Sequence, residues 1–277
     1  MRLIVDSGNT GGQRLGHGKT DRQGGCFRCP RRQRGHFEKL RRSVWPSPRA
    51  MLFQICQCVS TIPGIRMATD MAQERGLRIL GLSEIYGFNV WNDARAAEIA
   101  ALIDIAEASD AETFSLIPSV DDRTTRPLRD VMHAILPMLE GRRALPLTVG
   151  FESSTLRRKA ELAEAIAAVG GPRKFKMVHD TFLHTISGGT ELFAEFTGVV
   201  HISESSRPSV VLDTSQDAYC GLVDADDRWG NIAQITGLLQ SDYSGAFSLQ
   251  RTEDALIRNP GPMDLKNSFQ CAERAFL

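Results

Sequence analysis

The sequence lacks the long hydrophobic run of a membrane protein, because no stretch approaches the ~18 consecutive apolar residues that a spanning helix needs. Its first residues, Met-Arg-Leu-Ile-Val-Asp, also lack the apolar stretch of a secretory signal peptide. The formal net charge is zero, with 42% hydrophobic and 24% charged residues, which is the composition of a soluble globular chain. We therefore expect a cytoplasmic protein that makes no membrane contact.

Paired metal-binding and nucleotide-binding motifs are missing as well. Four of the six cysteines precede residue 60 and no paired spacing recurs later, so a disulfide framework is not expected. Cys26, Cys29 and His36 lack the second regular pair of a zinc knuckle, and chance placement is favoured over a zinc site. No Gly-x-Gly-x-x-Gly motif opens a helix after the first clear strand and no Gly-x-x-x-x-Gly-Lys-Ser/Thr motif occurs, which leaves nucleotide binding without support.

The first 66 residues differ in character from the rest. Residues 1–50 hold twelve Lys and Arg against three Asp and Glu, and the segment is rich in Gly, Arg, Gln, Ser and Pro without sustained apolar periodicity. We interpret residues 1–66 as a divergent basic segment that is irregular or disordered. Its arginines could attract nucleic acid, but a solvated tail is the favoured interpretation, so no nucleic-acid partner is expected.

Residues 67–277 alternate between strand-like and helix-like patterns, which is typical of repeated βα units. The expected strands cover residues 77–82, 112–117, 144–151, 174–179, 199–202 and 247–249. The expected helices cover residues 99–106, 128–139, 156–169, a short stretch near Glu191, 232–240 and 263–276. This alternation predicts an α/β fold, and a (β/α)₈ TIM barrel is favoured over a doubly wound sheet. Only six strands are found, so we expect an incomplete barrel whose first two βα units are missing or replaced.

Three polar residues lie at or near predicted strand ends. Asp180 and His201 offer the oxygen and nitrogen ligands of a site for Mg, Mn, Co or Zn, and Gln250 ends a third strand. From the residues alone, a helix-capping aspartate and a buried core histidine are the more common explanation. A metal site is therefore one of two alternatives at this stage.

Several segments together resemble one family. They are Val178-His-Asp-Thr-Phe-Leu-His184, Val200-His-Ile-Ser203 and Gly245-Ala-Phe-Ser-Leu-Gln250, whose order and spacing are similar to the xylose isomerase-like sugar phosphate isomerase/epimerase family. The inosose (2-keto-myo-inositol) isomerase-like members look most similar, and the resemblance covers about residues 67–277. It implies a TIM barrel that holds one divalent metal between two Glu, one Asp and one His, and that moves a carbonyl by proton transfer between adjacent carbons.

The resemblance assigns roles to individual residues. Asp180 and His201 match the metal-binding Asp and His, whereas Gln250 and Leu147 stand where the family has its two metal-binding glutamates. Glu152 could replace the first glutamate only from five residues further on, about 16 Å along a strand. Because two anionic ligands are lost, binding of the expected metal (Mn, Co, Mg or Zn) is weakened or lost.

The remaining candidates concern substrate and catalysis. Glu152 and Gln250 are the candidate catalytic positions, and His184 and Arg207 are the candidate substrate contacts. The predicted partner is a small-molecule sugar or cyclitol, and self-association into a homo-oligomer stays open. We predict a sugar or cyclitol isomerase/epimerase-like protein with weak or lost activity. The alternative is a non-catalytic sugar-binding protein or a degenerate remnant of such an enzyme.

Overall fold

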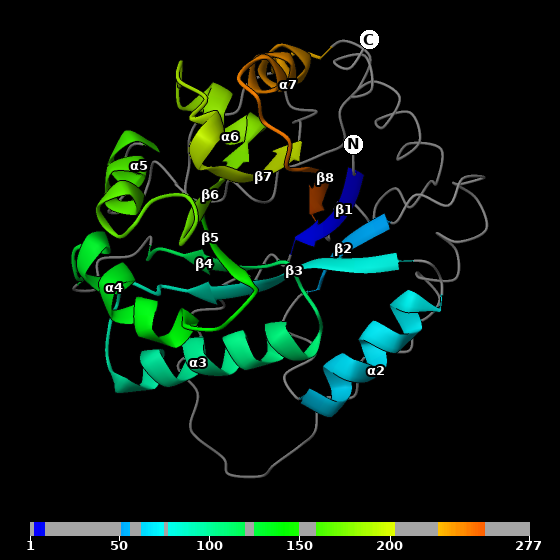
Figure 1. Ribbon diagram of the computed structural model, residues 1–277. Helices are drawn as coiled ribbons and strands as arrows, with labels where there is room; N and C mark the ends of the chain where they lie inside the picture. Colours follow the sequence, from blue (N-terminus) through cyan, green and yellow to red (C-terminus); the bar gives the residue numbers. More distant parts are fainter. Residues whose placement is uncertain are drawn as a thin grey trace, which may run out of the picture.

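The computed structural model describes residues 3–8, 51–55, 62–74, 77–119, 125–149, 159–202 and 227–252. For some of them, including all of β1 (Leu3–Gly8), all of β2 (Met51–Ile55) and Gln250, only the backbone is described. Eight parallel strands form a closed barrel in which strands that follow one another along the chain are neighbours in the sheet (Figure 1). The last strand pairs with the first, and this pairing closes the barrel.

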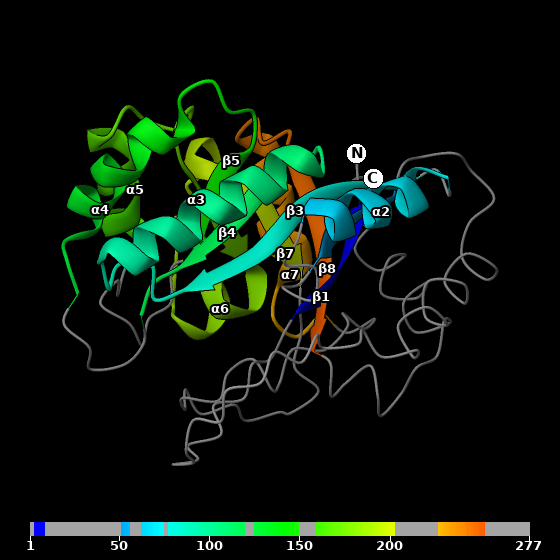
Figure 2. The same ribbon diagram turned by 90° about the horizontal axis from the view of Figure 1, so that it is seen from below.

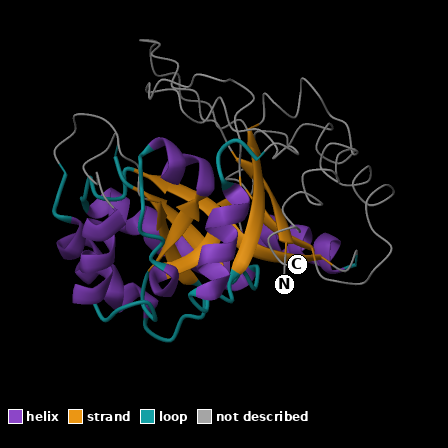
Figure 3. Cartoon of the chain, turned by 90° about the horizontal axis from the view of Figure 1, so that it is seen from above, coloured by secondary structure: helices purple, strands orange, loops and turns teal. Residues whose placement is uncertain are grey.

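Six further strands follow β1 and β2: β3 Leu77–Tyr86, β4 Thr113–Ile117, β5 Leu145–Val149, β6 Lys176–Asp180, β7 Thr197–Ile202 and β8 Ala246–Thr252. The described helices are α2 Ile62–Gln73, α3 Asp93–Ala108, α4 Leu128–Ile135, α5 Lys159–Ala168, α6 Thr181–Ile186 and α7 Asn231–Gln240, with 3-10 turns η1 Leu136–Leu139 and η2 Ala194–Phe196. Figures 2 and 3 show these helices outside the sheet. None of the helices that the structure describes is both long and apolar enough to cross a lipid bilayer.

The (β/α)₈ class predicted from the sequence is confirmed, and the six expected strands correspond to β3 through β8. The sequence predicted that the first two βα units are missing or replaced, and in the structure two short strands from the segment expected to be irregular, β1 and β2, complete the sheet. The sequence pattern missed them because neither lies in a segment with sustained apolar periodicity. The structure has no helix at Glu191: α6 lies earlier, at Thr181–Ile186, and the 3-10 turn η2 begins at Ala194. The helix expected over residues 263–276 lies outside the described residues.

Helix α3 shows how the local sequence directs the outer layer. Asn92 is the N-cap, and its side chain accepts a 2.8 Å hydrogen bond from the Arg95 amide. The apolar stripe predicted from the sequence is buried, with Ile99, Ile103 and Ala106 facing the sheet. These side chains join a large core cluster that also contains strand residues of β3, β4 and β6, and this cluster fills the space between sheet and helices.

A second, smaller cluster fills the inside of the barrel. Its members come only from strands and are Leu80, Ile117, Leu147, Val178, Val199 and Ala246. Because successive side chains of a strand point to opposite faces, this cluster identifies which positions of each strand face inward. Layers of inward-facing side chains are the normal filling of a TIM barrel.

A β-bulge between β6 and β7 sets the level of the strand ends. Met177 pairs with Thr197 and Val178 pairs with Val199, so Gly198 is the extra residue on β7. A Cβ on Gly198 would lie 2.5 Å from Leu147 Cδ2, so only glycine fits there without displacing the inner cluster. The Tyr243 hydroxyl lies 2.7 Å from Ala246 O and 3.3 Å from Gly198 O, which ties the bulge to β8. The shift of one residue brings Asp180 level with His201.

Candidate functional site

A polar layer lies directly above the inner apolar cluster at the carboxyl ends of three neighbouring strands. Asp180 on β6 pairs with His201 on β7, and His201 pairs with Ser248 on β8. Each of the three stands two residues after an inward-facing member of the apolar cluster, namely Val178, Val199 or Ala246, so all three face the barrel interior. This is the end of a TIM barrel at which active sites are built.

Asp180 has two structural roles at this position. It is the last residue of β6 and also the N-cap of α6, where its Oδ1 accepts a 2.8 Å hydrogen bond from the Leu183 amide. The side chains of Asp180 and His201 are only 5% and 7% exposed, so both polar groups lie in a largely desolvated layer. The helix-capping role and the strand-end role proposed from the sequence therefore coexist in the same residue.

A second polar cluster lies behind Asp180, on the helix side of β6. The Lys159 ammonium, at the start of α5, lies 2.9 Å from His179 Nδ1 and 3.2 Å from His184 Nδ1. The two imidazole rings have centroids 4.8 Å apart. On its other side, His179 Nε2 lies 2.9 Å from Gln234 Oε1 on α7. Three helices of the outer layer, α5, α6 and α7, thus meet β6 at one buried histidine.

The hydrogen-bond partners fix the tautomer of His179. The Gln234 amide nitrogen donates to Thr181 O at 3.1 Å and to Thr185 Oγ1 at 2.9 Å, so its oxygen faces His179 as an acceptor. His179 therefore carries its proton on Nε2, and its Nδ1 accepts from the Lys159 ammonium. A neutral imidazole is the form that this arrangement selects.

The charges of this cluster follow from burial. Burial lowers the pKa of Lys159 to about 8, and the Asp180 carboxylate opposes that shift. Burial, followed by repulsion from the Lys159 ammonium, lowers the pKa of His179 to about 3 and that of His184 to about 4. At neutral pH the cluster therefore holds one ammonium between two neutral imidazoles, with a carboxylate nearby.

The cluster is braced by the start of α7. Asp227 accepts hydrogen bonds from the Asn231 and Ile232 amides at 2.8 and 3.0 Å, which caps the helix on which Gln234 lies. Thr185 Oγ1 donates to Trp229 O at 2.7 Å, and Trp229 packs edge-on against Phe182. These contacts hold α6 and α7 together and so keep Gln234 beside His179.

The structure brings together two of the six candidate site residues predicted from the sequence, Asp180 and His201. His184 lies on the helix side of β6 with Lys159 and His179. Gln250 belongs to β8 two residues beyond Ser248, and its backbone pairs with Asp6 of β1. Glu152 and Arg207 lie outside the described residues, so their roles stay predictions.

Leu147, which stands at the position of a family glutamate, lies deep in the barrel. It is 3% exposed and belongs to the inner apolar cluster. It pairs with Lys176, four residues before Asp180 on β6, which corresponds to about 13 Å along the strand. A side chain at position 147 is therefore too far below the polar layer to share a ligand with Asp180.

The polar layer fits a divalent metal only in part. Asp180 and His201 supply a carboxylate and an imidazole at one level, which are suitable ligand types. Within the part of the chain that the structure describes, no group of three or more His, Cys, Asp or Glu side chains could hold a metal ion. The described residues do not complete a metal site by themselves.

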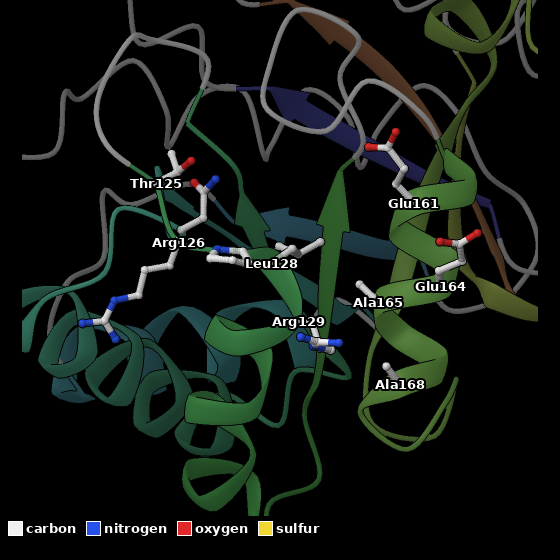
Figure 4. A pocket seen from close by; sticks show the side chains of 10 residues that line it. Thr125, Arg126, Leu128, Arg129, Glu161, Glu164, Ala165 and Ala168 are labelled. Atoms are coloured by element: carbon white, nitrogen blue, oxygen red, sulfur yellow. The ribbon is translucent and has the colours of Figure 1, made fainter.

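A surface groove lies between α4 and α5, and its lining includes residues of the loops that follow β3 and β4. It has a volume of about 540 Å³, with Arg126 and Arg129 on one wall and Glu161 and Glu164 on the other (Figure 4). The Arg129 side chain is 62% exposed and pairs with the neighbouring Asp130. The opposite charges of the two walls give the groove no preference for one class of ionic ligand.

Sequence reasoning missed Lys159, His179, Gln234 and Ser248. Two of them carried a signal: His179 directly precedes Asp180, and Ser248 stands two residues before Gln250, on the same face of the strand. Lys159 and Gln234 gave none, because each meets His179 only through packing of a helix that is distant in the sequence.

No family model matches the sequence, and no curated protein matches it. Solved structures do match. A xylose isomerase domain containing protein from Salmonella typhimurium LT2 is 17% identical with a TM-score of 0.72, and the match covers 100% of this chain and 97% of that one. The IOLI protein with a binding zinc atom is 12% identical with a TM-score of 0.66, covering 100% and 96%.

An enzyme named for a sugar reaction shares the fold too. The 3-keto-D-glucoside 4-epimerase YcjR from E. coli is 12% identical with a TM-score of 0.58, and the match covers 80% of this chain and 89% of that one. At these identities the likeness concerns the fold, which is the one that the sequence resemblance predicted. The chain has the fold of the xylose isomerase-like TIM barrels.

Proposed function

We propose that this barrel binds a sugar or cyclitol at the carboxyl ends of its strands, and that its reaction type is the proton transfer beside a carbonyl used by isomerases and epimerases. The observation that carries the proposal is the Asp180–His201 pair, held level on neighbouring strands inside a closed parallel barrel. The names of structural neighbours, which include a D-psicose 3-epimerase in the presence of D-fructose, support the same substrate class.

Asp180 and His201 would orient the substrate through hydrogen bonds. A buried carboxylate accepts from ligand hydroxyls, and a neutral imidazole both donates and accepts. Asp180 is preorganised by its bond to the Leu183 amide. When bound, a divalent metal would supply Lewis-acid polarisation of the carbonyl oxygen.

The remaining candidates take complementary roles in this proposal. Glu152 would be the group that accepts a proton, because the amide of Gln250 cannot do so and can only hold the substrate through hydrogen bonds. Arg207 would contact substrate hydroxyls. His184, the other substrate contact predicted from the sequence, lies on the helix side of β6 with its Nδ1 beside Lys159, so this proposal gives it no contact with a ligand inside the barrel.

We propose that catalysis is weak or absent. The described residues provide two candidate metal ligands, and an amide at position 250 adds no charge to a site for a hard cation. The second candidate function, a non-catalytic sugar-binding protein, is favoured by the same observation. A cytoplasmic location and self-association remain predictions.

The test combines metal titration with proton exchange. The full chain is titrated with Mn²⁺ by calorimetry, and exchange of the protons beside the carbonyl of 2-keto-myo-inositol or D-fructose into D₂O is followed by NMR. We expect Mn²⁺ binding weaker than micromolar, slow exchange, and loss of both in Asp180→Asn. Micromolar Mn²⁺ binding with rapid exchange would show a fully active isomerase. Binding of the sugar without exchange would favour the second candidate, and absence of any binding would refute the site.

A further inference from the structure

The polar layer contains a hydroxyl, that of Ser248, which has no hydrogen-bond partner within the described part of the chain. Ser248 stands on β8 in register with His201, and His201 stands in register with Asp180. The position two residues before each of them is occupied by an apolar member of the inner cluster, Ala246 in the case of Ser248. The Ser248 side chain therefore faces the same interior level as the two candidate ligand-binding residues.

The Ser248 hydroxyl is buried. The residue is 1% exposed, and its Oγ has no hydrogen-bond partner among the residues that the structure describes. Most buried polar groups in proteins have a hydrogen-bond partner, because a buried polar group without a hydrogen bond lowers the stability of the fold. An alanine would fill this strand position without that penalty, as Ala246 does one layer below. The hydroxyl of Ser248 therefore does not stabilise the protein through a hydrogen bond when no ligand is bound.

We infer that Ser248 is a ligand-binding residue whose hydroxyl bonds an oxygen of a polyol held at the layer formed by Asp180, His201 and Ser248. The inference rests on the proposed function and adds a residue to its site. The sequence pattern predicted Gln250, two residues further along β8, as a site residue and did not predict Ser248.

The chemistry of the three groups suits adjacent hydroxyls on a ring or chain. The Asp180 carboxylate only accepts, the His201 imidazole can donate and accept, and the Ser248 hydroxyl can do either. Vicinal hydroxyls of a sugar or cyclitol offer both donors and acceptors at short spacing. Because the layer is largely shielded from water, a hydrogen bond made there is stronger than one at the surface.

A matched control exists on the opposite face of the sheet. Thr148 on β5 is 1% exposed, and its Oγ1 also lacks a partner. It pairs with Met177, which belongs to the core between sheet and helices, so its side chain faces away from the barrel interior. Loss of this hydroxyl therefore should leave ligand binding unchanged.

The experiment measures binding of myo-inositol and of D-fructose to the full chain by calorimetry, for the wild type, Ser248→Ala, Thr148→Val and Asp180→Asn. We expect Ser248→Ala to bind on the order of tenfold more weakly, the loss of about one hydrogen bond. Thr148→Val should bind like the wild type. Without ligand, Ser248→Ala should unfold at the same temperature as the wild type or a higher one, because it removes an unsatisfied hydroxyl.

The outcomes separate this inference from the proposed function. If Asp180→Asn weakens binding while Ser248→Ala binds like the wild type, the inference is wrong and the proposed function stands. If the wild type binds neither polyol, both fail. If Ser248→Ala unfolds at a clearly lower temperature without ligand, the hydroxyl has a structural role and the inference is overturned.

Discussion

Substitution of His179 by glutamine should change how the stability of the protein depends on pH. His179 is fully buried between Lys159 and Gln234, and burial together with the Lys159 ammonium lowers its pKa from 6.5 to about 3. The unfolded chain binds a proton on this imidazole below pH 6.5, whereas the folded chain does not until about pH 3. Stability is therefore complete above pH 6.5 and is lost as the pH falls.

The magnitude follows from the shift in pKa. Between pH 6.5 and pH 5, His179 takes up a proton in the unfolded chain but not in the folded chain. This difference lowers the free energy of unfolding by about 2 kcal/mol. His184, whose pKa is lowered to about 4, contributes a loss of about 2 kcal/mol over the same interval. The free energy of unfolding of the wild type should fall by the sum of these two contributions. That of His179→Gln should fall only by the contribution of His184.

Urea unfolding at pH 7 and pH 5 measures this difference. Because a glutamine side chain can still bond both Lys159 and Gln234, we expect His179→Gln to fold and to lose about 2 kcal/mol less than the wild type between the two pH values. His133→Gln, at an exposed position on α4, is the matched control and should keep the pH dependence of the wild type. Equal pH dependence in wild type and His179→Gln would refute the neutral, buried histidine.

The other predictions concern packing and buried charge. Gly198→Ala should lower the free energy of unfolding by about 1–3 kcal/mol, since its Cβ would overlap Leu147, and normal stability in chemical denaturation would contradict the bulge geometry. Glu107→Ala should lower the free energy of unfolding by about 1–2 kcal/mol, because Glu107 Oε1 accepts a 2.9 Å hydrogen bond from the Ala144 amide just before β5. An unchanged midpoint of chemical denaturation would show that this hydrogen bond does not stabilise the fold. Between pH 8 and pH 10.5 only the unfolded chain keeps the proton on Lys159, so this side chain should contribute a rise of about 3 kcal/mol to the free energy of unfolding. Urea unfolding of Lys159→Met should lack that contribution, and an equal pH dependence in both proteins would contradict the buried ammonium.

Much of the fold could be predicted from the sequence because its patterns are local. The stripe of Ile99 and Ile103 predicted α3, and short apolar runs predicted β3 to β8. Strands β1 and β2 were not predicted because they lie in the first 66 residues, a segment without sustained apolar periodicity. Their pairing with β8 and β3 is long-range, and such contacts leave no trace in a local pattern.

The site shows the same division. Asp180 and His201 could be predicted as strand-end residues, and the structure places them level with each other. That level depends on Gly198, the extra residue of the bulge, which no spacing rule revealed. The buried partners of His179 come from α5 and α7, so only the tertiary packing brings them to β6.

The central claim is that a sugar or cyclitol binds inside the barrel beside His201 and Asp180. The most direct measurement is NMR of the full chain labelled with ¹⁵N-histidine, with each signal assigned by a single His→Gln variant, during titration with 2-keto-myo-inositol. We expect the chemical shifts of the His201 ring nitrogens to change and to saturate as ligand is added. The chemical shifts of His179, which is enclosed by Lys159 and Gln234 on the helix side of β6, should not change. A shift at His179 without one at His201, or no saturable shift at His201, would contradict the central claim.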